Sequence, residues 1–168
     1  MFYKQLKTNK IMKKSLKVGL GFGLTSGIIT TLGLIVGLNS AANSKAVILG
    51  GIITIAIADA FSDSLGIHIS EESEGHPDNQ VWEATISTFL SKLIFALTFV
   101  IPVYFLPLET AITASLIWGF SALGIFSYYI ANKKNMNPWK SVGEHVTLAV
   151  IVIVLTSFIG QWIGTIFV

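Results

Sequence analysis

The chain of 168 residues lacks cysteine and arginine and has few charged residues of either sign. Without cysteine there are no disulfides or thiolate metal sites, so any metal site must use oxygen and imidazole ligands. All eleven basic residues are lysines and the net charge is +2, which argues against a nucleic-acid-binding surface. Charged residues make up 12% of the chain, whereas soluble domains average about 25%. With a mean hydropathy of +0.72, the composition indicates a membrane protein.

Five apolar segments are long enough to cross a bilayer, which takes about 20 residues. The connections between them are short, so we expect one compact all-α bundle over residues 18–168 rather than separate domains. Residues 1–17 form a basic flank before it. The predicted spans are Val18–Leu38, Ala46–Ser70, Ala84–Leu106, Thr110–Ala131 and Val142–Val168.

The lysines predict how the bundle lies in the membrane. Six of them lie in the flank and three, Lys133, Lys134 and Lys140, follow the fourth span, whereas Lys45 is alone after the first. Cytosolic connections carry an excess of basic residues. We therefore expect an integral, multi-pass protein, with a cytosolic N-terminus and an external C-terminus, in the plasma membrane of a prokaryote. The acidic loop 71–83 then lies in the cytosol.

Two aspartates lie inside the second predicted span. Asp59 and Asp63 are four residues apart, which places them on one helix face about 6 Å apart along the axis. An ionisable side chain at that depth costs several kcal/mol unless it is paired, hydrated or bound to a ligand. Together with the hydroxyls of Thr25, Ser26 and Thr30 in the first span, these carboxylates predict a transient site for a divalent cation.

Lys92 in the third span offers a structural alternative. It lies at a depth similar to that of Asp63, so the two side chains could form a buried pair that needs no substrate. Asp59 has no evident basic partner and is therefore the stronger candidate for a transport residue.

The acidic loop supplies further candidate ligands, Glu71, Glu74 and His76. These side chains could collect cations at the membrane surface on the way to the two aspartates. The alternative is a solvated acidic turn without a specific ligand.

Glycines recur at four-residue spacing in the first span, at Gly19, Gly23 and Gly27. Such spacing lets two helix backbones approach closely. One interpretation is a homodimer interface, and we predict a homodimer through this span; the other is packing within one chain.

Several segments together have the order of motifs of a known family. The first span reads Phe22-Gly23-Leu24-Thr25-Ser26-Gly27-Ile28, and the second reads Ala60-Phe61-Ser62-Asp63-Ser64-Leu65-Gly66 followed by Glu72-Ser73-Glu74. Val81-Trp82-Glu83-Ala84 opens the third span, which later contains Pro102, and Thr156–Gly160 with Gly164 closes the last. The chain thus resembles the vacuolar iron transporter family of Fe²⁺ and Mn²⁺ transporters.

This resemblance implies a five-helix protomer, a homodimer with its path between the first spans, and proton-coupled export of metal from the cytosol. The family's ligands are replaced here: its two first-span aspartates fall on Phe22 and Ser26, its second-span glutamate on Ile55 and its methionine on Asp63. The family's metal-binding insertion between spans two and three is also missing.

We therefore expect a transporter rather than an enzyme, moving Fe²⁺ or Mn²⁺ out of the cytosol as substrate, with no resident cofactor. Its expected partners are the lipid bilayer and a second copy of the chain. Two alternatives remain open: transport of another cation, and a non-transporting membrane partner or assembly protein.

Overall fold

The computed structural model describes the backbone of residues 2–167 and the side chains of residues 15–167. The flank lysines before residue 15 therefore fall outside the described side chains. The described chain is helical apart from short connections. Its helices are α1 (Phe2–Ala42), α2 (Lys45–Ser73), α3 (Asp78–Thr98), α4 (Val100–Phe105), α5 (Leu108–Lys133) and α6 (Pro138–Phe167).

The prediction of five spans is confirmed in that five helical segments are long and apolar enough to cross a membrane. Four of them are single helices. The fifth combines α3 and α4 over Asp78–Phe105, because the chain makes a turn at Phe99. Pro102 accounts for this break, since its nitrogen has no hydrogen to bond the carbonyl of Thr98 and its ring crowds that carbonyl. The predicted span over Ala84–Leu106 therefore begins six residues earlier and is interrupted.

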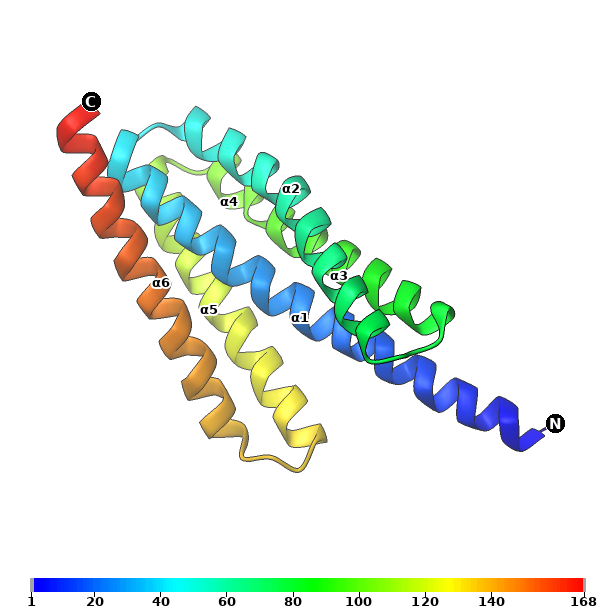
Figure 1. Ribbon diagram of the computed structural model, residues 1–168. Helices are drawn as coiled ribbons and strands as arrows, with labels where there is room; N and C mark the ends of the chain where they lie inside the picture. Colours follow the sequence, from blue (N-terminus) through cyan, green and yellow to red (C-terminus); the bar gives the residue numbers. More distant parts are fainter. Residues whose placement is uncertain (1, 168) are drawn as a thin grey trace.

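Helix α1 is the centre of the bundle. Figure 1 shows it running between α2 and α3 on one side and α5 and α6 on the other. The core along it is formed by buried aliphatic side chains of α1 packed against apolar residues of the other helices. The α1 members are Leu24, Ile28, Leu32 and Ile35, and the residues around them include Ile48, Ile52, Phe99, Val103 and Leu123.

The acidic loop is shorter than predicted. Helix α2 continues through Ser73 and α3 begins at Asp78, so only residues 74–77 connect them. Gly75 makes this sharp reversal possible, because its φ of +73° lies in the left-handed region that ends many helices. The amides of Gly75 and His76 bond back to the last turn of α2, at Glu72 O and Glu71 O. Residues 71 and 83 are therefore helical, not part of a loop.

The glycines at the start of the first span pack against α3 within the same chain. A Cβ at Gly23 would lie 2.5 Å from Thr88 O and still closer to Ser91 Oγ, and a Cβ at Gly27 would lie 3.2 Å from Lys92 O. The glycine ridge predicted to form a dimer interface is thus covered inside the protomer, which is the second interpretation given above. A homodimer stays a prediction, and it would need another surface.

Glycines farther along α1 pack against α6 in the same manner. A Cβ at Gly37 of α1 would lie 3.3 Å from Thr156 O of α6. In the other direction, a Cβ at Gly164 of α6 would lie 2.8 Å from Ala41 O of α1. Helix α1 therefore contacts α3 closely between Gly19 and Gly27, and α6 closely from Gly33 onward. Small residues allow both close approaches.

Candidate functional site

Lys92 is the most buried charged residue described and the centre of the site. Its side chain is 1% exposed and comes from α3 into the space between α1 and α2. There Nζ contacts the carboxylates of both Asp59 and Asp63, and it donates a hydrogen bond of 2.9 Å to Ser26 Oγ. We call Asp59, Asp63 and Lys92 the charged triad.

The two aspartates lie on one face of α2, near its middle. Asp59 is the fifteenth of 29 residues in the helix, and Asp63 follows one turn later. The predicted pairing of Asp63 with Lys92 is confirmed, because Lys92 Nζ donates a hydrogen bond to Asp63 Oδ2. The expectation that Asp59 has no basic partner is wrong, because its Oδ2 lies 2.5 Å from the same nitrogen. That contact is an ion pair and not a hydrogen bond.

One lysine reaches both carboxylates because residues four apart on a helix lie on the same face. A lysine opposite the midpoint between two such residues has the length to touch each of them. Depth in the membrane pairs Lys92 with Asp63 but does not predict its second contact, with Asp59.

Ser26 connects α1 to the charged triad. Its hydroxyl donates a hydrogen bond of 2.7 Å to Asp63 Oδ2 while its oxygen accepts from Lys92. The neighbouring hydroxyls are used differently: Thr25 and Thr30 donate to carbonyls of their own helix, at Gly21 and Ser26. Ser26 is therefore the α1 hydroxyl that takes part in the site.

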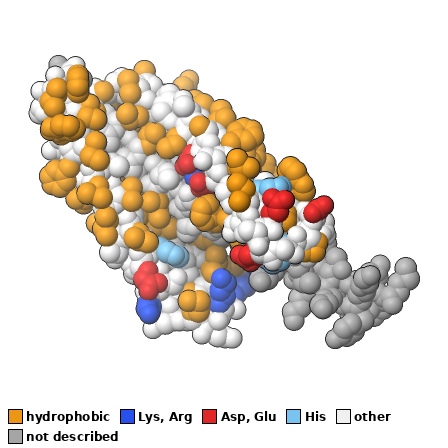
Figure 2. Space-filling view, in the orientation of Figure 1, with side chains coloured by type: hydrophobic (Ala, Val, Ile, Leu, Met, Phe, Trp, Pro, Cys, Tyr) orange, Lys and Arg blue, Asp and Glu red, His pale blue; other side chains and the backbone are white. Residues whose placement is uncertain are grey.

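The charged triad carries a formal charge of −1, from two carboxylates and one ammonium. Its carboxylates are not sealed, since the side chains of Asp59 and Asp63 are 25% and 21% exposed. Figure 2 shows acidic and basic atoms together midway along one face, with apolar and uncharged atoms around them and the other charged groups of that face nearer its lower end. A charged group exposed on such a face needs water, a partner or a ligand beside it.

The predicted ligands near the α2–α3 connection form a second, separate group. His76 Nδ1 lies 2.8 Å from Glu71 Oε2, and His76 Nε2 lies 3.9 Å from Glu74 Oε2. Glu71 is eight residues beyond Asp63, which corresponds to about 12 Å along the helix axis. Among the described residues, no group of three or more His, Asp or Glu side chains has an arrangement that could hold a metal ion.

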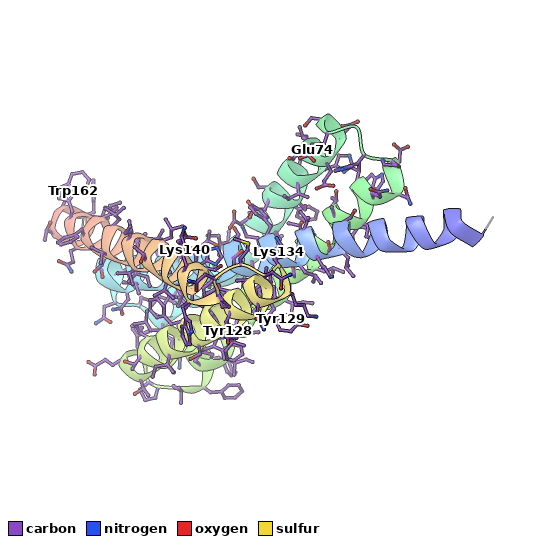
Figure 3. The ribbon with its side chains drawn as sticks, turned by 90° about the horizontal axis from the view of Figure 1, so that it is seen from below. Glu74, Tyr128, Tyr129, Lys134, Lys140 and Trp162 are labelled. Atoms are coloured by element: carbon purple, nitrogen blue, oxygen red, sulfur yellow. The ribbon has the colours of Figure 1, made fainter. Side chains whose placement is uncertain are left out.

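This second group lies at the same end of the bundle as the basic α5–α6 connection. Figure 3 shows Glu74 at the tip of the α2–α3 hairpin, set apart from Lys134 and Lys140. The two hairpins thus present opposite charges at separate places on this end.

An apolar groove of about 540 Å³ lies between α2 and α3 but does not include the charged triad. Its lining is mostly apolar and aromatic, with His68 at one side, whose Nδ1 lies 3.0 Å from Thr85 Oγ1. Ser62 faces this groove rather than the aspartates. The polar residues of α2 thus face two different places: Asp59 and Asp63 face Lys92, whereas Ser62 faces the groove. The groove is not part of the candidate site.

Two polar contacts of the structure had no clear signal in the sequence. Ser127 of α5 is buried, and its Oγ lies 2.7 Å from His145 Nδ1 of α6. Lys45 at the start of α2 donates to the carbonyls of Tyr104 and Leu106, at 2.8 and 3.0 Å. Both join residues far apart in the chain, so spacing along one helix could not predict them.

Comparison with protein families gives no match to the chain, and comparison with curated proteins gives none either. The resemblance to the vacuolar iron transporter family therefore stays a prediction. Over the described residues, the molecule is an all-helical protein with five helical segments long and apolar enough to cross a membrane.

Proposed function

We propose that this chain is a membrane transporter that moves a cation out of the cytosol, with the charged triad as its exchange site. The observation that supports the proposal is the pair of partly exposed carboxylates held midway along a membrane-length helix. Ionisable residues inside a span are rare, because they are costly there, and they mark substrate, ion and proton paths.

Each member of the site has a distinct role in this proposal. Asp59 and Asp63 supply the negative charge that attracts the cation, and their oxygens suit a hard cation. Ser26 orients Asp63 through its hydrogen bond of 2.7 Å. Lys92 balances one of the two charges when no substrate is present. Glu71, Glu74 and His76 lie where a cation would enter from the cytosol, if the lysine distribution sets the orientation as predicted.

Fe²⁺ and Mn²⁺ are the substrates that the family resemblance implies. The direct test is cation flux into proteoliposomes with Fe²⁺, Mn²⁺, Co²⁺, Zn²⁺ and Ca²⁺, together with Na⁺ and K⁺. A pH gradient across the same vesicles tests the implied proton coupling. Asp59→Asn should abolish flux, because the amide keeps the shape of the side chain and removes its charge.

The matched control is Asp78→Asn, which makes the same chemical change on an exposed residue in the first turn of α3. This variant should keep the flux of the native protein. Native flux from Asp59→Asn protein would exclude Asp59 from the site.

A second candidate function is a non-transporting membrane protein in which the charged triad only holds helices together. The observation in its favour is that Lys92 is 1% exposed and contacts both aspartates and Ser26. Breaking a buried ion pair costs about 3–5 kcal/mol, because it leaves one charge unpaired.

A stability measurement combined with flux separates the two functions. Lys92→Met should lower the free energy of unfolding in both cases, and the double change Asp63→Asn with Lys92→Met should restore part of it. A purely structural triad predicts that the native protein carries no cation at all. Flux that depends on Asp59 supports the transporter.

A further inference from the structure

We infer that the exchange site takes a cation of single charge, of the Na⁺ or K⁺ class, in preference to a divalent metal. This inference rests on the proposed transport function and narrows its substrate. It follows from the charge of the triad and from the way in which the triad already holds one cation.

The ammonium of Lys92 is a bound monovalent cation attached to the protein. Its nitrogen has three oxygen neighbours from two helices: Asp59 Oδ2, Asp63 Oδ2 and Ser26 Oγ, of which Asp59 Oδ2 lies at 2.5 Å and Ser26 Oγ at 2.9 Å. These are hard oxygen atoms, which are also the ligands that an alkali cation accepts. The native site therefore already holds one charge of +1 between its two carboxylates.

Part of the carboxylate surface remains for a second cation. Lys92 and Ser26 contact the Oδ2 atoms, and among the described residues no hydrogen bond reaches Oδ1 of Asp59 or of Asp63. Both side chains are more than a fifth exposed, so these oxygens have access to an incoming ion.

The charge count then selects the ion. The triad has a charge of −1, so one monovalent cation brings the site to neutrality, whereas a divalent ion leaves an excess of +1 among apolar helices. Uncompensated charge within a few Å of Lys92 is strongly unfavourable in a medium of low dielectric constant. A divalent metal site would also favour more carboxylate or imidazole ligands, and the described residues offer no group of three.

A series of variants changes the charge of the site one unit at a time. The native site has −1, Lys92→Met gives −2, Asp63→Asn with Lys92→Met returns it to −1, and Asp59→Asn gives 0. Lys140→Met is the matched control, because it removes an exposed lysine far from the triad along the chain. Flux of Na⁺, K⁺, Mn²⁺ and Fe²⁺ is measured for each protein in proteoliposomes.

The native protein and the control should prefer a monovalent ion over Mn²⁺ by at least about tenfold, because one unit of unbalanced charge separates the two loaded states. Lys92→Met should shift the preference towards Mn²⁺, and the double variant should return it to the monovalent ion. If Lys92→Met does not fold, the double variant remains informative, because it lacks the lysine but has the native charge of −1. Its preference for a monovalent ion would show that the charge of the site, and not Lys92 itself, selects the ion. Native flux of Mn²⁺ or Fe²⁺ without Na⁺ or K⁺ would overturn this inference and leave the proposed function standing. No flux of any cation would reject the proposed function itself.

Discussion

The close approach of α1 and α3 predicts a large difference between two glycine substitutions. Gly23 lies where the backbones meet, and a Cβ placed on it would lie 2.5 Å from Thr88 O and 3.1 Å from Lys92 N. Both of these atoms belong to the α3 backbone, so a side-chain rotation cannot remove the clash. Gly66 on α2 is the matched control, since a Cβ there has nothing within 4 Å.

The expected effects have opposite signs. Overpacking costs about 1–3 kcal/mol, and a clash with backbone belongs at the upper end of that range. Alanine favours a helix over glycine by about 1 kcal/mol, so Gly23→Ala should lose about 2 kcal/mol of unfolding free energy. That corresponds to a factor of about 30 in the unfolding equilibrium. Gly66→Ala should gain up to about 1 kcal/mol, because only the helix term acts there.

Unfolding in mixed micelles, followed by circular dichroism as the denaturing detergent increases, measures both variants against the native protein. The two variants should differ by about 3 kcal/mol. Equal stability of Gly23→Ala and Gly66→Ala would show that the α1–α3 contact is looser than described, and the assignment of the glycine ridge to internal packing would fail.

Four further predictions test the ends of the bundle and its assembly. Lys45→Met should lower the free energy of unfolding by about 1–2 kcal/mol, because the carbonyls of Tyr104 and Leu106 lose a charged donor. A variant as stable as the native protein would contradict a stabilising role for these two hydrogen bonds. His145→Ala should lower the free energy of unfolding by about 1 kcal/mol in the same assay, because the contact with Ser127 is lost. An unchanged free energy of unfolding would show that this contact does not stabilise the protein. The chain has no native cysteine, so a membrane-impermeant thiol reagent applied outside intact cells should label Glu109→Cys and spare Asn79→Cys; the reverse pattern would invert the orientation. Mass measurement in detergent should give a dimer, and a monomer would contradict the predicted assembly.

The number and order of the membrane-length helices followed from hydropathy, because each span is a continuous apolar run. Their limits were less accurate. Helix α2 extends to Ser73, because a helix can continue beyond its apolar segment with a polar last turn. It ends before the turn at Gly75. The break at Phe99 follows from Pro102, but the position of Pro102 in the sequence predicts only that some distortion occurs nearby.

The candidate site was predicted in part. Two carboxylates four residues apart on an apolar helix identify a shared face, and Lys92 at similar depth identifies a partner. What the sequence does not contain is the rotation of α3 about its axis, which decides whether Lys92 meets one carboxylate or two. The packing of Gly23 and Gly27 against α3 sets that rotation, so the contact with Asp59 depends on the tertiary structure.

The central position of α1 has a consequence for the order in which the protein is made. Helix α1 is synthesised before the other helices described, and its glycines fit α3 around Gly23 and α6 around Gly37. Until those helices are inserted, lipid must cover both surfaces. A nascent chain that stops before Pro138 would have Gly33 and Gly37 without their neighbour, so it should remain loosely packed and open to quality-control proteases until α6 enters the membrane.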